Sequence, residues 1–219
     1  MLEKLYQFRF RLLLFAQLSI LFGALLFTSD WFESYISPVL FILNLFAGVV
    51  LFSASKRKMW SIIVLLCIAI ICFGVDISKI KYKKLFSALH LIIFFLFYLL
   101  LTLETIKQVW NSKEVDKHVI FGLISGYISL GLIGFFICLS IEIAYPNSFS
   151  GLIEGVSITE NLMYYSYITL LTIGYGDILP VNALAHKAAI LIGLMGQIYL
   201  VVITAIVVGK YINQISIKK

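Results

Sequence analysis

Charged side chains are scarce in this sequence of 219 residues. Asp, Glu, Lys and Arg make up 13% of it and hydrophobic residues 62%, whereas soluble globular domains are about a quarter charged and about half apolar. A fold of this composition has too few polar side chains to cover its surface, which argues against a soluble globular domain. No stretch is left that could fold a water-soluble catalytic domain of about 100 residues. We therefore expect no enzymatic activity.

Cysteine is nearly absent as well. Cys67, Cys72 and Cys138 each lie within an apolar run. We interpret them as small hydrophobic residues at lipid-facing or packing positions, and they imply neither a disulfide framework nor a metal centre. The sequence also has no nucleotide motif, no metal-ligand cluster and no internal repeat, so no organic cofactor is expected.

A basic stretch with a nucleic-acid-binding fold is also missing. The net charge of +6 and the isoelectric point of about 9.2 would suggest a nucleic-acid partner in a soluble protein. Here no basic stretch carries a groove-reading fold, so we expect no nucleic-acid partner. The cations are better explained as residues of short loops that orient membrane helices.

Long apolar runs are what the sequence does contain, and its mean hydropathy is +1.04. A bilayer core about 30 Å thick needs about 20 apolar residues per helix. On this basis we predict an all-α membrane protein with six transmembrane helices, at residues 10–28, 36–54, 59–75, 85–104, 118–144 and 185–209. The first run could be a cleaved signal peptide, but its length, the acidic Glu3 and the lack of an Ala-x-Ala site favour its retention.

A polar stretch from Glu104 to Lys117 divides the chain. We predict a four-helix domain at 1–104, a linker at 105–117 and a two-helix domain at 118–219. Six spans put both termini on one side of the membrane. With that side cytoplasmic, 12 of the 17 Lys and Arg residues lie inside, as the positive-inside rule requires.

One lysine cluster conflicts with this topology, because it falls on the outer side. It consists of Lys79, Lys81, Lys83 and Lys84. These side chains could contact lipid headgroups, act as a weak voltage sensor at the outer end, or lie in a solvated loop with snorkelling stems.

The most specific motif lies between the last two predicted helices. It reads Thr172-Ile-Gly-Tyr-Gly-Asp177 and follows the amphiphilic run Tyr164–Leu171. This pattern resembles the selectivity filter and pore helix of the tetrameric potassium channels, with Ile173 in place of the usual valine. The alternative is a glycine-rich extracellular turn. The resemblance implies a re-entrant pore helix and filter, and it extends strongly over 118–215, whereas 1–117 is only an architectural analogue of the voltage-gated members.

The residue types of this motif suit ion conduction. A permeating potassium ion must exchange its water shell for oxygen ligands, which backbone carbonyls supply if all of them point to one axis. Gly174 and Gly176 allow the left-handed dihedrals that this requires. The ion-binding residues are then Thr172, Ile173, Gly174, Tyr175 and Gly176, with K+ held at the first four of these. One strand cannot surround an ion, so four identical chains are expected to assemble as a homotetramer.

Residues around the filter are assigned by the same resemblance. Tyr164 would hydrogen-bond to Asp177, and Tyr165 and Thr169 would brace the Tyr175 hydroxyl. Both Tyr164 and Tyr165 could instead be ordinary interfacial aromatics. Independently of the resemblance, Ser157-Ile-Thr-Glu160 fits a capping box that starts the pore helix. Ile168 replaces a glutamate of some family members, so their inactivation behaviour does not transfer to this chain.

The last apolar run resembles the inner helix of small bacterial channels. Gly196 aligns with the hinge glycine of the family, where a missing Cβ lets a helix bend; Gly193 could instead be a close-packing position. Four residues at helical spacing are predicted to line the cavity and then the gate: Gln197, Leu200, Thr204 and Val208. The alternative is that these four merely pack against the fifth helix.

Arginine is missing from the fourth apolar segment. Voltage-gated channels carry arginines at every third position there, whereas residues 85–103 contain His90 as their one ionisable group, and Asn44 is the main polar residue at depth in the preceding spans. We therefore predict a sensor-like domain that packs against lipid without sensing voltage. His90, His118 and His186 could respond to pH or simply be hydrated.

Together these observations predict a potassium-selective channel that conducts passively and is not strongly voltage-dependent. The rival interpretations are a voltage-gated channel with a weak sensor, a regulatory subunit and a component of a potassium transporter. The expected partners are three further copies of the chain and membrane lipids, and no cytoplasmic nucleotide- or calcium-binding domain is expected. The expected location is the bacterial inner membrane, with both termini in the cytoplasm.

Overall fold

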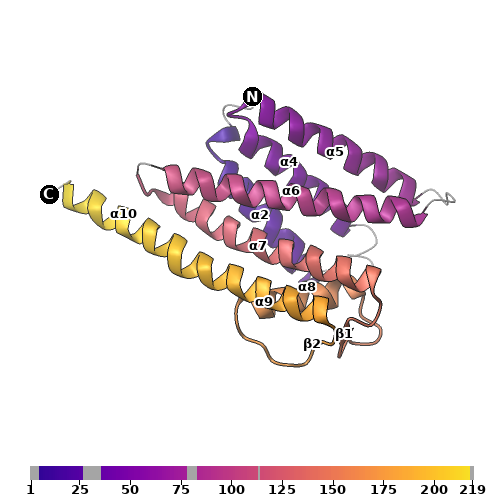
Figure 1. The fold of residues 1–219 in the computed structure, drawn as a ribbon. Helices are drawn as coiled ribbons and strands as arrows, with labels where there is room; N and C mark the ends of the chain where they lie inside the picture. Colours follow the sequence, from indigo (N-terminus) through magenta and orange to yellow (C-terminus); the bar gives the residue numbers. More distant parts are fainter. Residues whose placement is uncertain (1–4, 27–35, 78–82, 113, 218–219) are drawn as a thin grey trace.

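The helices of the chain follow its apolar segments. The computed structural model describes residues 5–26, 36–77, 83–112 and 114–217 (Figure 1). The elements in chain order are α2 (Arg9–Phe22), η1 (Gly23–Leu25), α4 (Ser37–Phe52), α5 (Lys56–Ile77), α6 (Lys83–Asn111), α7 (Lys117–Ala144), β1 (Phe149–Ser150), α8 (Ile158–Leu170), β2 (Leu179–Pro180), α9 (Ala183–Ile198), η3 (Tyr199–Ile203) and α10 (Thr204–Ile217). Apart from two strands of two residues each, the described secondary structure is helical.

Three of the described helices are long and apolar enough to cross a membrane by length and composition. They are Leu91–Asn111 within α6, Lys117–Ala144, which is α7, and Ala183–Ser216, which combines α9, η3 and α10. Helix α4 is also apolar but shorter. The described part of the chain is therefore predominantly helical, with three helices that could span a membrane, as in an all-α membrane protein.

Helix α6 differs from its predicted segment at the C-terminal end. It continues to Asn111, seven residues into the predicted linker 105–117, and leaves only residues 112–116 between α6 and α7. The extension is held by burial, because Thr105 and Val109 are almost completely inaccessible to solvent. The prediction that the helix ends at Glu104 was wrong, since the polar side chains of this stretch occupy one face and the other face packs inward.

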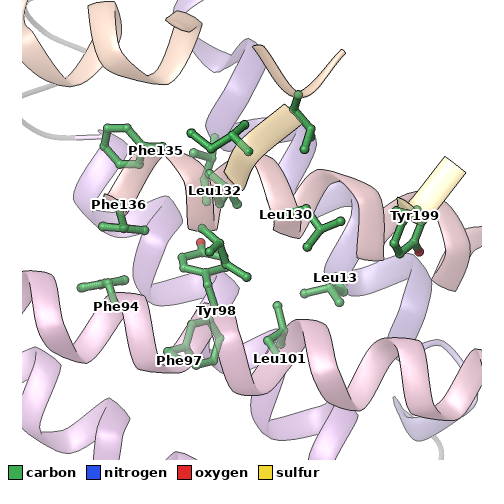
Figure 2. Packing of buried hydrophobic residues seen from close by; sticks show 14 of the residues in the cluster. Leu13, Phe94, Phe97, Tyr98, Leu101, Leu130, Leu132, Phe135, Phe136 and Tyr199 are labelled. Atoms are coloured by element: carbon green, nitrogen blue, oxygen red, sulfur yellow. The ribbon is translucent and has the colours of Figure 1, made fainter. Parts of the chain in front are cut away.

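An aromatic cluster joins α6 to α7. The rings of Phe94 and Tyr98 stack on Phe136 with centroid distances of 5.8 and 5.5 Å, and Phe41 of α4 meets the same Phe136 edge-on. Figure 2 shows these α6 and α7 side chains facing one another across the interface. Buried aromatic pairs of this kind add to the stabilisation from apolar burial, so the four-helix half is packed directly against α7.

Glycines along α7 allow other elements to approach it closely. A Cβ at Gly122 would lie 2.9 Å from Val109 of α6, and a Cβ at Gly126 would overlap the hydroxyl of Tyr199. At Gly131 it would overlap the ring of Tyr167. Helix α7 therefore packs closely against α6 at Gly122, and against the second half of the chain at Gly126 and Gly131.

Polar side chains connect four helices at one end of the first half. The Arg9 Nε of α2 donates to Gln108 Oε1 at 2.8 Å, and Gln108 Nε2 donates to Glu104 Oε1 and to the Leu51 carbonyl. Lys58 of α5 forms an ion pair with Glu104 at 2.6 Å. This network links α2, α4, α5 and α6.

Candidate functional site

Helix α8 is the short helix that precedes the TIGYGD motif. Its N-cap is Ser157, whose hydroxyl accepts a hydrogen bond from the Glu160 N–H at 3.1 Å, as the predicted capping box requires. A residue that the sequence did not reveal secures the preceding loop. The buried Asn161 amide accepts from Ile153 N at 3.0 Å and donates to three backbone carbonyls, those of Ile153, Val156 and Ser157.

Hydroxyl groups fix α8 to α7. The Ser166 hydroxyl donates to the Gly131 carbonyl and the Tyr167 hydroxyl donates to the Ile128 carbonyl, both at 2.7 Å. From the other direction, the Tyr127 hydroxyl of α7 donates to the Leu170 carbonyl at 3.2 Å. The carbonyls of the last helical turn have no partner within a helix, and Tyr127 supplies one of them. The C-terminal end of α8 is therefore held at a fixed position.

The segment after α8 has an alternating backbone. Thr172, Gly174 and Gly176 have φ values of +57°, +57° and +79°. The left-handed dihedrals predicted for the two glycines are present, and the one at Thr172 was not predicted. A left-handed non-glycine residue is strained by about 1 to 3 kcal/mol. This alternation differs from a β-strand, in which successive carbonyls point in opposite directions.

Backbone hydrogen bonds attach the start of this segment to α8. The N–H groups of Ile173 and Gly174 both donate to the carbonyl of Ile168, at 3.0 and 3.4 Å, and Thr172 N donates to the Thr169 carbonyl at 3.0 Å. The amides are thus turned toward α8. These hydrogen bonds hold residues 172–174 in place against the end of α8 and help to offset the backbone strain at Thr172.

Tyr164 and Asp177 connect α8 to the far end of the motif. The Tyr164 hydroxyl donates to Asp177 Oδ2 at 2.6 Å, so the predicted hydrogen bond is present. This bond holds the pKa of the Asp177 carboxyl below its ordinary value and raises the pKa of Tyr164 to about 12. Asp177 therefore carries its negative charge at neutral pH at the end of the motif.

Tyr165 and Thr169 lie on α8 behind the motif. The Tyr165 ring packs edge-on against Phe149 at 5.1 Å. Within one chain neither braces Tyr175, whose side chain is 73% exposed. Their predicted contact with the Tyr175 hydroxyl stays a prediction about an assembly of chains.

A small frame, made by β1, β2 and Glu142, lies next to the Asp177 end of the motif. Strand β1 pairs antiparallel with β2, Phe149 with Pro180 and Ser150 with Leu179. The buried carboxylate of Glu142, at the end of α7, accepts from the N–H groups of Asn147, Ser148 and Phe149 at 2.7, 2.9 and 3.2 Å. Glu142 thus holds the turn that leads into β1, and through β2 it holds the segment that follows Asp177.

A second connection of this frame runs to the inner helix. Asn182 is the N-cap of α9 and accepts from Ala185 N at 2.8 Å. Its Nδ2 donates to the Ser148 hydroxyl at 2.5 Å. At Gly151, whose φ is +80°, a Cβ would overlap the Asp177 carbonyl oxygen. Neither the Asn182–Ser148 bond nor the close approach of Gly151 to Asp177 could be predicted from sequence, because each joins segments about 30 residues apart.

Gly196 is a close-packing position. A Cβ there would overlap the carbonyl oxygen of Leu170 at the end of α8, whereas a Cβ at Gly193 would meet nothing within 4 Å among the described residues of the chain. Close packing was predicted as a possible role of Gly193, but within one chain it is Gly196 that lets two backbones approach closely. The role of Gly196 as a hinge stays a prediction.

A π-helical turn interrupts the inner helix just after Gly196. It spans Tyr199–Ile203, and the Tyr199 hydroxyl donates to the Leu123 carbonyl of α7 at 2.6 Å. A π-turn adds about one residue to the helical repeat. The predicted stripe of Gln197, Leu200, Thr204 and Val208 assumed uninterrupted α-helical spacing, which this turn interrupts. Its role in lining a cavity and a gate stays a prediction.

The features predicted for the first half are described only in part. The lysine cluster 79–84, Cys72 and the His90 side chain lie outside the described residues or side chains. Asn44 is fully buried, and neither side-chain atom has a hydrogen-bond partner among the described residues. Cys67 is exposed and Cys138 is buried. No group of three or more His, Cys, Asp and Glu residues that could hold a metal occurs in the described parts.

Comparison with known proteins adds one family match. Residues 122–213 match the family model described as "Ion channel". The match covers most of α7, all of α8 and the motif, and most of the helix formed by α9, η3 and α10. This match supports an ion-channel family of the potassium-channel type, and it points to a protein of the membrane-transport kind. Searches of curated proteins and of solved structures found no match.

Proposed function

We propose that this chain forms a potassium-selective channel that conducts K+ passively through residues 172–176. The alternating left-handed dihedrals at Thr172, Gly174 and Gly176 carry the proposal, because they are what aligned carbonyl ligands require. The ion ligands would be the carbonyls of Thr172, Ile173, Gly174 and Tyr175, with Gly176 completing the turn of the strand. Potassium is here the transported ion and no further cofactor is proposed.

Four copies of the chain are proposed to surround the ion path. A single chain offers one set of carbonyls, while a dehydrated ion needs oxygens on all sides. The exposure of the motif in one chain agrees with this, since Tyr175 and Ile173 are 73% and 47% exposed. The inner helix is similarly uncovered, with 22% of its apolar window buried against 67% for α7. A homotetramer would cover both surfaces.

The proposed channel is not strongly voltage-dependent. Residues 91–111 of α6 contain Glu104 and Lys107 as their charged residues and no arginine. Moving one charge across the membrane supplies about 2.3 kcal/mol per 100 mV, so a steep response needs several charges at membrane depth. Glu104 is moreover fixed by its ion pair with Lys58. We place the chain in a bacterial inner membrane with both termini in the cytoplasm, a topology in which Asp177 faces outward.

The test is potassium flux from proteoliposomes that contain only this protein. The informative variant is Gly174→Ala, because φ is +57° and nothing within 4 Å would obstruct the added Cβ in one chain, so the change acts on the backbone. The matched control is Gly155→Ala, which has φ of +81° and the same open surroundings but lies before α8. We expect Gly174→Ala to abolish the flux and Gly155→Ala to preserve it.

Ion replacement then tests selectivity. With sodium in place of potassium we expect little flux from the unchanged protein. Equal flux of the two ions would contradict a filter, and equal loss in both glycine variants would show that left-handed glycines are required for folding and not for conduction. A steep sigmoidal dependence of open probability on voltage would contradict the proposed absence of a sensor.

A further inference from the structure

Arg11 is placed where α2 meets the start of α7. Its guanidinium carbon lies 5.1 Å from the ring centroid of Phe121 and 5.8 Å from that of Phe8. Its Nε atom is buried and has no hydrogen-bond partner among the described residues. Cation–π contacts attract a guanidinium but provide no acceptor for its N–H groups, five of which are available.

Other cations at this end of the molecule are supplied with oxygen acceptors by the protein. Arg9 donates to Gln108 and to the Tyr6 carbonyl, and Lys58 pairs with Glu104. Lys210 of α10 donates to the Ser112 carbonyl at 3.1 Å and to that of Trp110. Arg11 differs from these cations, because within the described chain its environment consists of aromatic faces.

Two more residues that can carry positive charge, Lys117 and His118, lie on the same side of α7. Lys117 and His118 precede Phe121 by four and three residues, so all three share one helix face. Lys117 is exposed, and the buried Nδ1 of His118 has no partner among the described residues. The neighbouring Asp116 is the N-cap of α7, and one of its carboxylate oxygens, Oδ1, accepts from Val119 N at 2.9 Å.

We propose that this surface, made by Phe8, Arg11, Lys117, His118 and Phe121, binds the phosphate of an anionic phospholipid. A phosphate oxygen pair matches the planar guanidinium, for which bidentate phosphate binding is the favoured geometry. Positive charge next to a membrane also attracts anionic lipids, with about 1 kcal/mol for each Lys or Arg. The site lies outside the ion path and depends only on the helices being embedded in a bilayer.

The apolar residues beside Arg11 indicate a lipid as the source of the phosphate. Phe15, one turn along α2, is 67% exposed, and Phe8 and Ile124 are exposed as well. Phe15 lies four residues after Arg11 on α2, and Ile124 lies three residues after Phe121 on α7. These two side chains therefore extend the exposed apolar surface from Arg11 toward the middle of α2 and α7. A free phosphate would leave these apolar side chains exposed to water, whereas the acyl chains of a phospholipid would cover them.

The experiment is a titration of the purified, detergent-solubilised protein with phosphatidylglycerol, followed by native mass spectrometry. Phosphatidylcholine serves as the lipid without net charge, and glycerol phosphate as the headgroup without acyl chains. The variants are Arg11→Gln and Lys117→Gln. The matched control is Arg57→Gln, which removes the same charge from an exposed residue at the start of α5.

We expect the apparent Kd for phosphatidylglycerol to rise about tenfold in Arg11→Gln and about fivefold in Lys117→Gln, and to stay within about twofold in Arg57→Gln. Lys117 is exposed, so its variant tests the site even if Arg11→Gln fails to fold. Equal weakening in Arg57→Gln and Lys117→Gln would reduce the effect to general charge and overturn the proposal. Equal binding of glycerol phosphate, or of phosphatidylcholine, would also overturn it.

The result is independent of conduction. Lipid binding is measured without an ion gradient, and potassium flux can be recorded in vesicles of phosphatidylcholine alone. A chain that binds phosphatidylglycerol at Arg11 without passing potassium would contradict the channel and leave the lipid site intact. A conducting chain without selective lipid binding would do the reverse.

Discussion

Replacing Glu142 by Gln tests whether a buried carboxylate organises the segments next to the Asp177 end of the motif. The two carboxylate oxygens accept three backbone N–H groups, from Asn147, Ser148 and Phe149. A glutamine offers one oxygen, so at least one donor loses its acceptor and faces an NH2 group. Ser148 and Phe149 are almost completely buried whereas Asn147 is exposed, so the glutamine oxygen would serve the buried pair and Asn147 would turn to water.

The expected cost is set by the bonds that change. A hydrogen bond to a charged group contributes about 1.5 to 3 kcal/mol and one between neutral groups about 0.5 to 1.5 kcal/mol. The two remaining bonds become neutral and the third is partly replaced by water. We therefore expect the local opening free energy of residues 147–149 to fall by about 2 kcal/mol, which corresponds to about thirtyfold faster exchange of their amide hydrogens.

Hydrogen exchange read by mass spectrometry measures this effect directly. The matched control is Glu154→Gln, because Glu154 lies in the connection from β1 to α8, is exposed and has no bonding partner among the described residues. Peptides that cover 147–149 should exchange faster in Glu142→Gln and unchanged in Glu154→Gln. Unaltered exchange in Glu142→Gln would refute the reasoning, as would the same acceleration in both variants.

Two further predictions concern the inner helix and the outer end. Gly196→Ala should lower stability by about 1 to 3 kcal/mol, since its Cβ would overlap the backbone of Leu170, whereas Gly193→Ala should raise it by up to about 1 kcal/mol through helix propensity. Thermal unfolding compares the two, and equal shifts would contradict the packing assignment. Tyr164→Phe should return the lowered pKa of Asp177 toward its ordinary value. The wild-type Asp177 carboxyl, held by Tyr164, keeps its negative charge to lower pH than the variant's carboxyl does. External acid should therefore begin to inhibit potassium flux at a higher pH in Tyr164→Phe than in the wild type. An unchanged pH of half-inhibition would contradict this role of Tyr164.

Features that depend on neighbouring residues in the sequence could be predicted. The cap at Ser157, the left-handed dihedrals of Gly174 and Gly176 and the bond from Tyr164 to Asp177 are all present. The cap and the dihedrals follow from residue type and local spacing. The bond follows from a family resemblance that fixes a short separation of 13 residues.

Features that depend on tertiary burial could not be predicted. Glu142 and Asn161 are residue types that usually lie on the surface. Only their burial and their hydrogen bonds to backbone groups show that they hold loops in place. The end of α6 was placed too early for a similar reason, because Thr105 is buried although the stretch around it is polar. The positive φ of Thr172 accompanies the hydrogen bonds from the amides of Ile173 and Gly174 to the Ile168 carbonyl. These bonds cannot be predicted from residue type.

Gly196 shows how one sequence feature can have two physical explanations. A glycine in an apolar helix is compatible both with bending and with close packing. In the structure its missing Cβ makes room for the Leu170 carbonyl, the same oxygen that accepts from Tyr127. A bend at Gly196 would therefore have to displace the end of α8, to which Ile173 and Gly174 are attached through Ile168.

The π-turn at Tyr199–Ile203 is free of that constraint. It lies beyond Gly196 and is attached through the Tyr199 hydroxyl to Leu123 of α7. On the C-terminal side of the turn, Lys210 of α10 donates to the carbonyls of Trp110 at the end of α6 and of Ser112, and Gln214 accepts from Val115 N. The helix formed by α9, η3 and α10 is thus held on one side of the turn at the C-terminal end of α8, and on the other side at the end of α6 and the connection that follows it. Any relative movement of those two attachments must be taken up between Gly196 and Lys210, where the helical repeat is already irregular.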